Sequence, residues 1–175
     1  MLQIIEQMSE AVNVIEKQLS ELTKDDEMVQ RLMTIRCCGK ITVWIIRAYT
    51  EDIGRFASAK KYAAFCGLVP WVQDSNETIH HGKITKRGHQ ELRTAYVQLV
   101  LGSRRCKDTS EWRITQRLNY MKKNKGSGKS IVVAARRMAE IVWVLLTEKQ
   151  NFDSGKMMGK YKPMNLMEQV LATRN

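Results

Sequence analysis

Proline and glycine are scarce in this sequence, with two and ten residues among 175. This scarcity excludes collagen-like and proline-rich linker proteins. Long apolar runs are also missing, because Arg47 interrupts one stretch and Glu148 ends another. No run therefore reaches the roughly 18–20 residues that a membrane helix needs. The N-terminus is acidic and amphipathic, unlike a signal peptide. These absences predict a cytoplasmic protein with no membrane partner.

Cysteine is limited to four residues, and no two of them form a C-x-x-C pair. The adjacent Cys37 and Cys38 are a poor start for a disulfide framework or a zinc site. We therefore expect reduced cysteines with a structural role.

Positive charge is in excess and is unevenly distributed. The formal net charge is +11. Residues 1–27 contain seven acids and two lysines, a net of −5, so residues 28–175 carry +16. Within these, residues 79–137 hold fifteen Lys and Arg against three acids. Such a field attracts a polyanion, and nucleic acid is the first candidate. A ribosome-associated protein or a merely soluble basic face would have the same composition.

The first segment has the heptad pattern of a coiled coil. Ile5, Val12 and Leu19 form one seven-residue series, and Met8, Ile15 and Leu22 form the other. We expect this helix either to pair with a helix of another subunit or to pack on its own domain. Residues 1–27 are thus predicted to be a coiled-coil-like helix, 28–150 the main domain and 151–175 a basic, Met-rich tail.

The remaining pattern predicts a mainly α fold. A second helix starting at Asp25 and Asp26 and a third over 41–50 would form a helical hairpin, similar to a helix-hairpin-helix, that presents Lys40 to a phosphate. A plain helical hairpin is the alternative. The polar, β-branched stretch 69–88 predicts a loop or small β-hairpin. A helical bundle follows, with helices over about 90–101, 110–121 and 130–147.

Two motifs that suggest a ligand are rejected. Residues 126–130 read Gly-Ser-Gly-Lys-Ser, but Lys123 stands where a phosphate-binding loop requires its first glycine. We expect instead a turn that caps the next helix through Ser127 or Ser130. His80, His81 and His89 lack further ligands at a usual spacing, and no set of acids resembles a two-metal site. No metal ligand is predicted.

Ser75 is the candidate nucleophile. It lies in the polar stretch with several basic residues shortly downstream, and cations can stabilise the charge that develops on a phosphate under attack. A serine in such a stretch is more often a turn or cap residue. The basic residues that we expect to contact nucleic acid are Lys40, Lys83, Lys86, Arg87, Arg93, Arg104, Arg105, Lys122, Lys123, Lys125 and Lys129.

The order of these segments resembles the C-terminal transposase domain of the IS-one-ten and IS-one-sixteen families of bacterial insertion-sequence transposases, shared by Piv-type DNA invertases. The resemblance covers about residues 33–148. It rests on Gly39-x-Ile-Thr, the run from Ile53 to Pro70, Ser75, the block Gly82-Lys-Ile-Thr-Lys-Arg-Gly88 and Leu92-Arg93. Ala134-Ala-Arg-Arg-Met-Ala139 fits the family's final helix.

The resemblance implies that 28–150 is a recombinase domain whose Ser75 attacks a DNA phosphate. In the family an N-terminal RuvC-like domain holds four acidic ligands for a divalent metal such as Mg²⁺, and a structured RNA guides the best-studied members. It further implies that 1–22 pairs with another copy or with a full-length transposase. The protein would then be nucleoid-associated, need no cofactor in this chain, and be a truncated member that is inactive without the acidic domain.

Two stretches depart from the family pattern. Arg36-Cys37-Cys38-Gly39 replaces Pro-Gly-x-Gly, and Ser75-Asn76-Glu77 replaces Ser-Gly-Gly. The second change places an acid beside the expected nucleophile. The alternative function is therefore a non-catalytic DNA- or RNA-binding remnant that associates with a full-length transposase.

Overall fold

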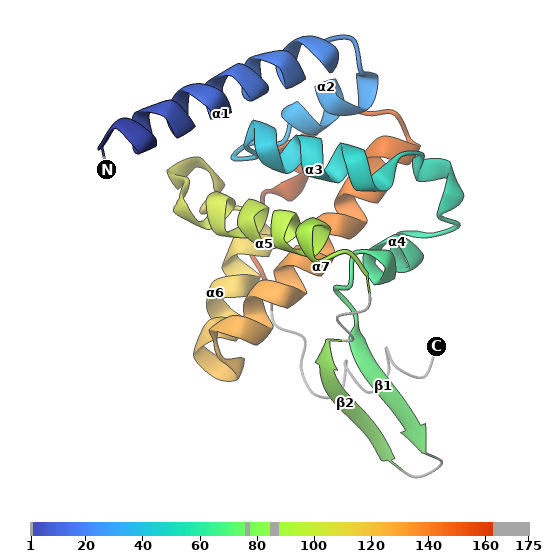
Figure 1. Cartoon of the computed structure of the whole chain (residues 1–175). Coiled ribbons are helices and arrows are strands. Elements are labelled where there is room, and N and C mark those ends of the chain that lie inside the picture. Colours follow the sequence, from blue (N-terminus) through green and yellow to red (C-terminus); the bar gives the residue numbers. More distant parts are fainter. Residues whose placement is uncertain (1, 76–77, 85–87, 163–175) are drawn as a thin grey trace.

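The computed structural model describes residues 2–75, 78–84 and 88–162 (Figure 1). The fold is mainly α, as the sequence predicts. The longer elements are α1 (Leu2–Leu22), α2 (Glu27–Met33), α3 (Lys40–Thr50), α4 (Ala59–Phe65), β1 (Pro70–Ser75), β2 (Thr78–Ile84), α5 (Gln90–Arg105), α6 (Arg113–Lys125) and α7 (Ser127–Thr147). Three short 3₁₀ turns cover Ile53–Arg55, Lys107–Thr109 and Gly155–Met157.

Helix α7 lies at the centre of the helical body. It packs against α2, α4, α5 and α6. Its buried side chains include three alanines, which allow the neighbouring helices to approach closely, and larger residues that fill the core between them. These buried residues are Ala134, Ala135, Met138, Ala139, Val142, Leu145 and Leu146.

Side-chain caps fix the starts of two short helices. The Asp26 carboxylate accepts hydrogen bonds from the backbone N–H groups of Met28 and Val29, at 2.9 and 3.1 Å, and begins α2. The Ser58 hydroxyl accepts one from Lys61 and begins α4. The expected cap of the last long helix is wrong. Helix α7 follows Gly126, whose φ is +83°, without a side-chain cap, and Ser130 is buried within the helix.

The helices end later than the hydrophobic pattern indicates. Helix α5 continues to Arg105, and α6 runs from Arg113 to Lys125. Most of the added residues are polar or basic and exposed, whereas Ser103 is buried. Apolar periodicity therefore identifies the packed turns of these helices but misses their exposed ends.

Strands β1 and β2 form the β-hairpin that is one of the two expected conformations of 69–88. Ser75 pairs with Thr78 at one end, and Pro70 pairs with Ile84 at the other. Near that second end, β2 has one more residue than β1, because Val72 pairs with His81. This irregularity is typical of a β-bulge, which increases the twist of the hairpin.

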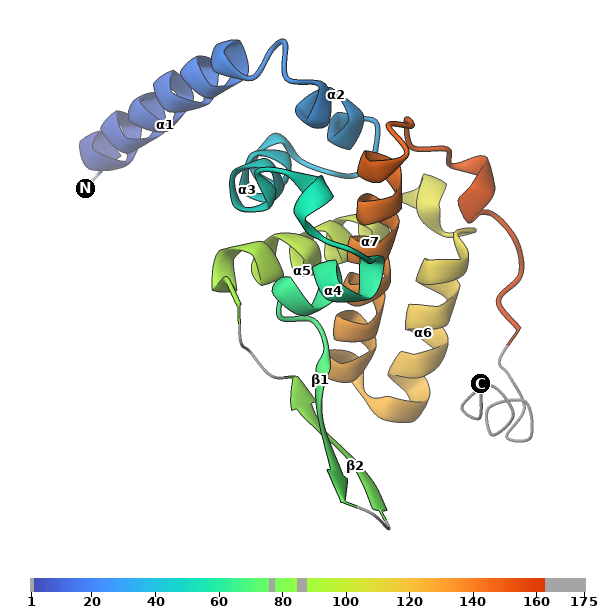
Figure 2. The ribbon, with the colours of Figure 1, turned by 90° about the vertical axis from the view of Figure 1, so that its right-hand side faces the viewer.

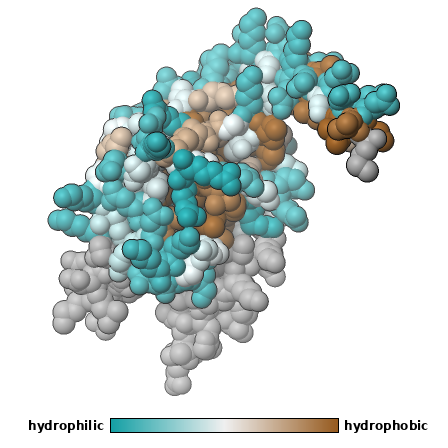
Figure 3. All heavy atoms as spheres, turned by 90° about the vertical axis from the view of Figure 1, so that its left-hand side faces the viewer, coloured by the Kyte–Doolittle hydropathy of each residue, from teal (hydrophilic) through white to brown (hydrophobic). Residues whose placement is uncertain are grey.

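Helix α1 extends from the helical body as an arm (Figures 1 and 2). None of its residues is buried. Apolar atoms along it are visible at the surface in Figure 3. Ile5, Met8, Val12 and Ile15, from both heptad series, are each more than half exposed. The expectation that this helix packs on its own domain is therefore wrong, because its apolar stripe faces solvent.

Residues 151–162 return along the helical body. The Phe152 N–H donates to the Thr34 hydroxyl at 2.8 Å, and its ring lies 5.2 Å from that of Trp112. Further along, the Tyr161 N–H donates to the side-chain oxygen of Gln116 at 2.8 Å. The described part of the expected tail is thus attached to α2 and α6.

A disulfide joins Cys37 to Cys106, which corrects the expectation of reduced cysteines. The two residues lie 69 positions apart, in the turn before α3 and at the end of α5. The fold brings them together because α3 packs against α5. Cys38 and Cys66 are free, and burial raises the pKa of both thiols to about 12.

None of the described helices is both long enough and apolar enough to cross a membrane.

The cap at Asp26 gives a stability prediction. Burial alone would raise the pKa of this carboxyl, but the Arg47 guanidinium 2.6 Å away and the N–H groups of Val29 and Met28 lower it below its ordinary value. Asp26→Ala should lower the free energy of unfolding by about 1–2 kcal/mol at neutral pH. Because the folded pKa is depressed, this difference is present above a pH of about 3.9 and is lost as the pH falls through the folded value. Urea denaturation at several pH values measures it, with the exposed Asp25→Ala as control. An equal loss in both variants would contradict the assigned cap.

The disulfide predicts a thiol count. Protein denatured without reductant should expose two reactive thiols, and protein reduced first should expose four. Reduction should also lower the unfolding free energy by about 2–4 kcal/mol, because the open chain gains conformational entropy. Alkylation followed by mass spectrometry gives the count. Four thiols without reductant would contradict the bond.

Candidate nucleic-acid interface

The β-hairpin carries Ser75 away from the helical body. Ser75 is the last residue of β1, at the end of the hairpin that points away from the helices (Figure 1). Lys83 belongs to β2, whereas Lys86 and Arg87 lie outside the described residues. The backbone thus places the candidate nucleophile on a projecting ribbon.

Two glycines shape the base of the hairpin. Gly67 ends α4 with a φ of +67°, a left-handed conformation that favours glycine. Gly88 has a φ of +114°, and a Cβ atom there would overlap the Phe65 carbonyl oxygen. Position 88 is therefore restricted to glycine both by its conformation and by this close approach. The end of α4 and the start of α5 are held together at this point.

Aromatic rings pack around the same base. The His89 ring lies 4.6 Å from Tyr49 and 5.4 Å from Phe65, measured between ring centroids. The Arg55 guanidinium stacks 4.8 Å from the centroids of both Phe56 and Phe65. His89 therefore has a packing role, and no group of three or more metal-ligating side chains occurs within the described ranges.

A buried row of hydroxyls links three helices beside this base. The Thr50 and Tyr62 hydroxyls are 2.8 Å apart, and so are those of Tyr62 and Tyr96. Burial raises the pKa of both tyrosines, so they remain neutral. The row joins α3, α4 and α5 and positions the helices from which the hairpin emerges.

The first basic group lies at the turn between α6 and α7. Its members are exposed and come from the last turn of α6 and the first turn of α7. In both Figure 1 and Figure 2 this turn is on the same side of the helical body as the hairpin. We call it the lysine turn; it consists of Lys122, Lys123, Lys125 and Lys129.

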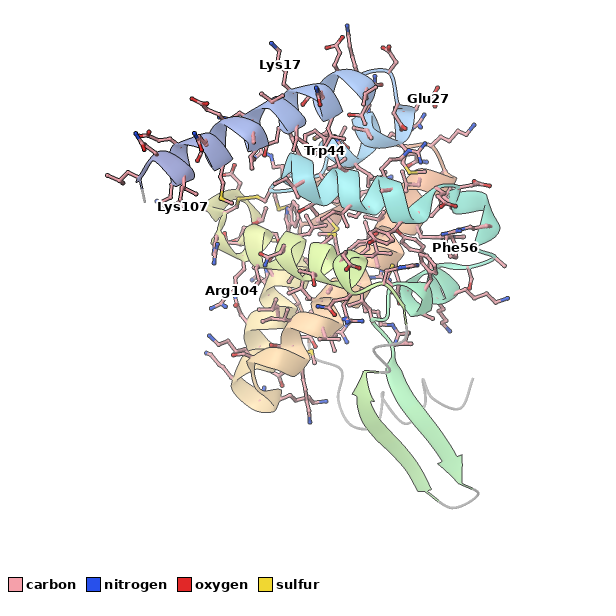
Figure 4. All side chains as sticks on the ribbon, in the orientation of Figure 1. Lys17, Glu27, Trp44, Phe56, Arg104 and Lys107 are labelled. Carbon is pink, nitrogen blue, oxygen red and sulfur yellow. A yellow bond between two sulfur atoms is a disulfide. The ribbon has the colours of Figure 1, made fainter. Side chains whose placement is uncertain are left out.

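The second basic group lies where α3 begins and α5 ends. Lys40 is the exposed first residue of α3, and Arg104 and Arg105 are the exposed last residues of α5. The disulfide and an ion pair between Arg36 and Asp108 join these two ends. Lys107, seen with Arg104 in Figure 4, belongs to the same group. The sequence prediction missed Lys107, although it continues the basic run that starts at Arg104.

Arg93 differs from the other expected contacts. It lies in the first turn of α5 and is half-buried there. The expected basic residues are therefore not one surface. The structure groups the lysine turn with the hairpin side, places Lys40 with the end of α5, and leaves Arg93 near the base of the hairpin.

The comparison with known proteins matches this region of the fold. Residues 29–114 match the family model described as "Transposase IS116/IS110/IS902 family". This segment belongs to the IS116/IS110/IS902 transposase family. It runs from α2 to the first residues of α6, so the family segment includes the hairpin, Ser75 and the second basic group.

Relatives in three bacteria extend the similarity. The chain is 30% identical over 150 residues to "Transposase for insertion sequence element IS1111A" of Coxiella burnetii, which covers 83% of this chain and 40% of that relative. It is 26% identical to "Probable family 20 transposase" of Pseudomonas aeruginosa, over 81% of this chain and 42% of the relative. "Transposase for insertion sequence element IS1328" of Yersinia enterocolitica is 28% identical over the same shares. The chain thus spans about two fifths of the length of these transposases.

The lysine turn predicts a salt-dependent interaction with duplex DNA. Each lysine that contacts a phosphate adds about 0.9 to the slope of log affinity against log salt concentration. Replacing all four lysines by alanine should reduce that slope by about 2–4 and weaken binding of all sequences alike. Fluorescence anisotropy between low and moderate salt measures it, with exposed Lys17 and Lys149 replaced as the control. An unchanged slope in the fourfold variant would contradict the assignment.

Proposed function

We propose that this chain is a DNA-binding transposase domain that acts in insertion-sequence transposition, with Ser75 as the nucleophile. The observation that carries the proposal is the position of Ser75. A family segment presents this serine at the outer end of a projecting hairpin, and the lysine turn lies on the same side of the body. DNA held against those lysines would have its backbone next to the hairpin.

The chemistry is a transesterification. The Ser75 oxygen attacks a DNA phosphorus, a P–O ester bond to the neighbouring sugar breaks, and a phosphoserine link forms. The serine loses its proton, and the released sugar oxygen gains one. Nearby cations stabilise the negative charge on the phosphate oxygens, which is the largest contribution that a basic surface can make to this step. A DNA hydroxyl later attacks the phosphoserine and releases Ser75.

We propose that the divalent metal is bound by a different domain of the recombinase. The residues described here supply cations and a hydroxyl, and no group of three carboxylates, histidines or cysteines occurs among them. We propose that the four-carboxylate RuvC-like domain of a transposase subunit holds Mg²⁺, and that a structured RNA guides the complex. The exposed arm α1 is the proposed link to that subunit or to a second copy of this chain.

A covalent adduct tests the proposal. The protein is mixed with supercoiled DNA carrying element ends, the guide RNA and a full-length partner transposase. The wild-type chain should form a protein–DNA adduct that survives denaturation. Ser75→Ala should reduce the adduct to background, because alanine lacks the hydroxyl oxygen that bonds to the DNA phosphorus. Thr78→Ala, at the position paired with Ser75, is the matched control and should retain the adduct.

Two results would overturn the assignment of Ser75 as the nucleophile. One is an adduct that persists in Ser75→Ala, and the other is its absence from the wild type. If the wild type forms no adduct but binds DNA with the predicted salt slope, the chain is a non-catalytic DNA-binding remnant.

A further inference from the structure

A groove separates α6 and α7 from the returning segment 150–161. Its volume is about 650 Å³. Its floor is aliphatic and includes Ile114, Ile141 and Leu145. Val144 is 39% exposed there, in the last turn of the central helix of the fold. Phe152 and Tyr161 of the returning segment also line the groove, and an apolar groove of this kind suits the apolar face of an amphipathic helix.

The groove has a positively charged rim. Arg113 and Arg117 border it on α6, Lys60 on α4, Arg137 on α7 and Lys156 on the returning segment. Three acids also line it: Glu140, which pairs with Arg136 and Arg137 at 3.2 and 3.0 Å, and Glu148 and Asp153. The five cations still exceed the three acids. The groove therefore suits a ligand that is apolar along one side and carries negative charge.

Helix α1 has these two properties. It carries four glutamates and one lysine, and none of its residues is buried. Ile4 is 59% exposed and lies beside the heptad positions, as does Ala11. The apolar stripe is consequently wider than a two-position coiled-coil seam, and a wide stripe is typical of a helix that packs on a larger surface.

Pairing of α1 with the α1 of another copy is disfavoured by its charges. With Ile5 at the first core position, the flanking positions hold Ser9, Glu16, Ala11 and Gln18. No pair of opposite charges is available at these positions to select a self-paired coiled coil. Two such helices would also bring two acidic arms together, whereas the groove offers arginines and lysines.

We propose that α1 of one copy docks its apolar stripe in the α6–α7 groove of a second copy. This inference rests on the association through α1 proposed above and names its receptor. The arm extends to one side of the body, and α6 and the returning segment lie on the other (Figure 2). The contact is therefore between different surfaces of two copies; reciprocal docking of both arms closes a two-fold pair, and one-way docking builds a ring or an open chain.

Sedimentation velocity over a concentration series tests the groove. Val144→Glu places a charge on the exposed floor, and Ile15→Glu, at a position that is 54% exposed, places one on the arm. Each should weaken self-association at least tenfold and leave the circular dichroism spectrum unchanged. Ile41→Glu on α3 is the matched control, because Ile41 is 57% exposed and does not line the groove; it should associate as the wild type does.

Mixing the two variants distinguishes the modes of pairing. A Val144→Glu copy retains its arm and an Ile15→Glu copy retains its groove, so the mixture should form heterodimers and no larger species. A Val144→Glu variant that associates like the wild type would overturn the proposal in favour of arm–arm pairing. A mixture that stays monomeric, or a wild type that is monomeric throughout, would also overturn it.

Duplex DNA binding is measured on the same samples to keep the two proposals apart. Both variants should bind DNA with wild-type salt dependence at concentrations where the wild type is monomeric. Weaker DNA binding by Val144→Glu alone would assign the groove to nucleic acid and overturn the docking proposal. Failure of the wild type to bind DNA would overturn the proposed function and leave the association result intact.

Discussion

Close packing around α7 is the constraint on which the other features depend. Ala134, Ala135 and Ala139 are buried on this helix, and larger side chains at these positions would force its neighbours apart. Helices α4 and α5, which hold the two ends of the hairpin, both pack on α7. The lysine turn is the connection between α6 and α7. A shift of α7 would therefore displace Ser75 and the lysines relative to each other.

Polar contacts then specify how the packed helices are oriented. The Thr50, Tyr62 and Tyr96 hydroxyls satisfy one another in a site that excludes water. Truncating one of them would leave a buried polar partner unpaired, which costs about 1–3 kcal/mol. The row therefore favours the one arrangement of α3, α4 and α5 in which all three hydroxyls meet. The orientation of the hairpin base follows from this arrangement of α3, α4 and α5.

Local signals predicted several parts of the fold that are formed by neighbours in sequence, although the expected serine cap of α7 is wrong. Asp26 and Ser58 act as caps because their side chains reach N–H groups two or three residues ahead, and the β-branched stretch with its glycines folds as a hairpin. Contacts between distant residues were not predictable in this way. The bond between Cys37 and Cys106, and the packing of Phe152 on Trp112, both depend on how the helices are arranged.

The candidate site shows the same division. Motif order selected Ser75 as the candidate nucleophile, and the charge count indicated a basic body. Neither could separate the lysine turn from the group at Lys40, because the two are distinguished by the directions in which α3, α5 and α6 run. The groove was also hidden from the sequence, since its floor comes from α6 and α7, and Lys60 and Lys156 lie almost a hundred residues apart.

The two proposed binding surfaces lie at opposite ends of α6, an arrangement that would allow DNA and a second copy to bind at the same time. Arg113 and Arg117 border the groove in the first half of the helix, and Lys122, Lys123 and Lys125 lie in its last turn. At 1.5 Å per residue, the midpoints of the two sets are separated by about 12 Å along the axis. That is longer than the screening length of about 8 Å at physiological ionic strength. An acidic arm docked at the first end would therefore reduce the attraction of the lysine turn for DNA only weakly. In the proposed arrangement, a basic body with an acidic arm would thus assemble with itself through one surface and still hold a polyanion on another.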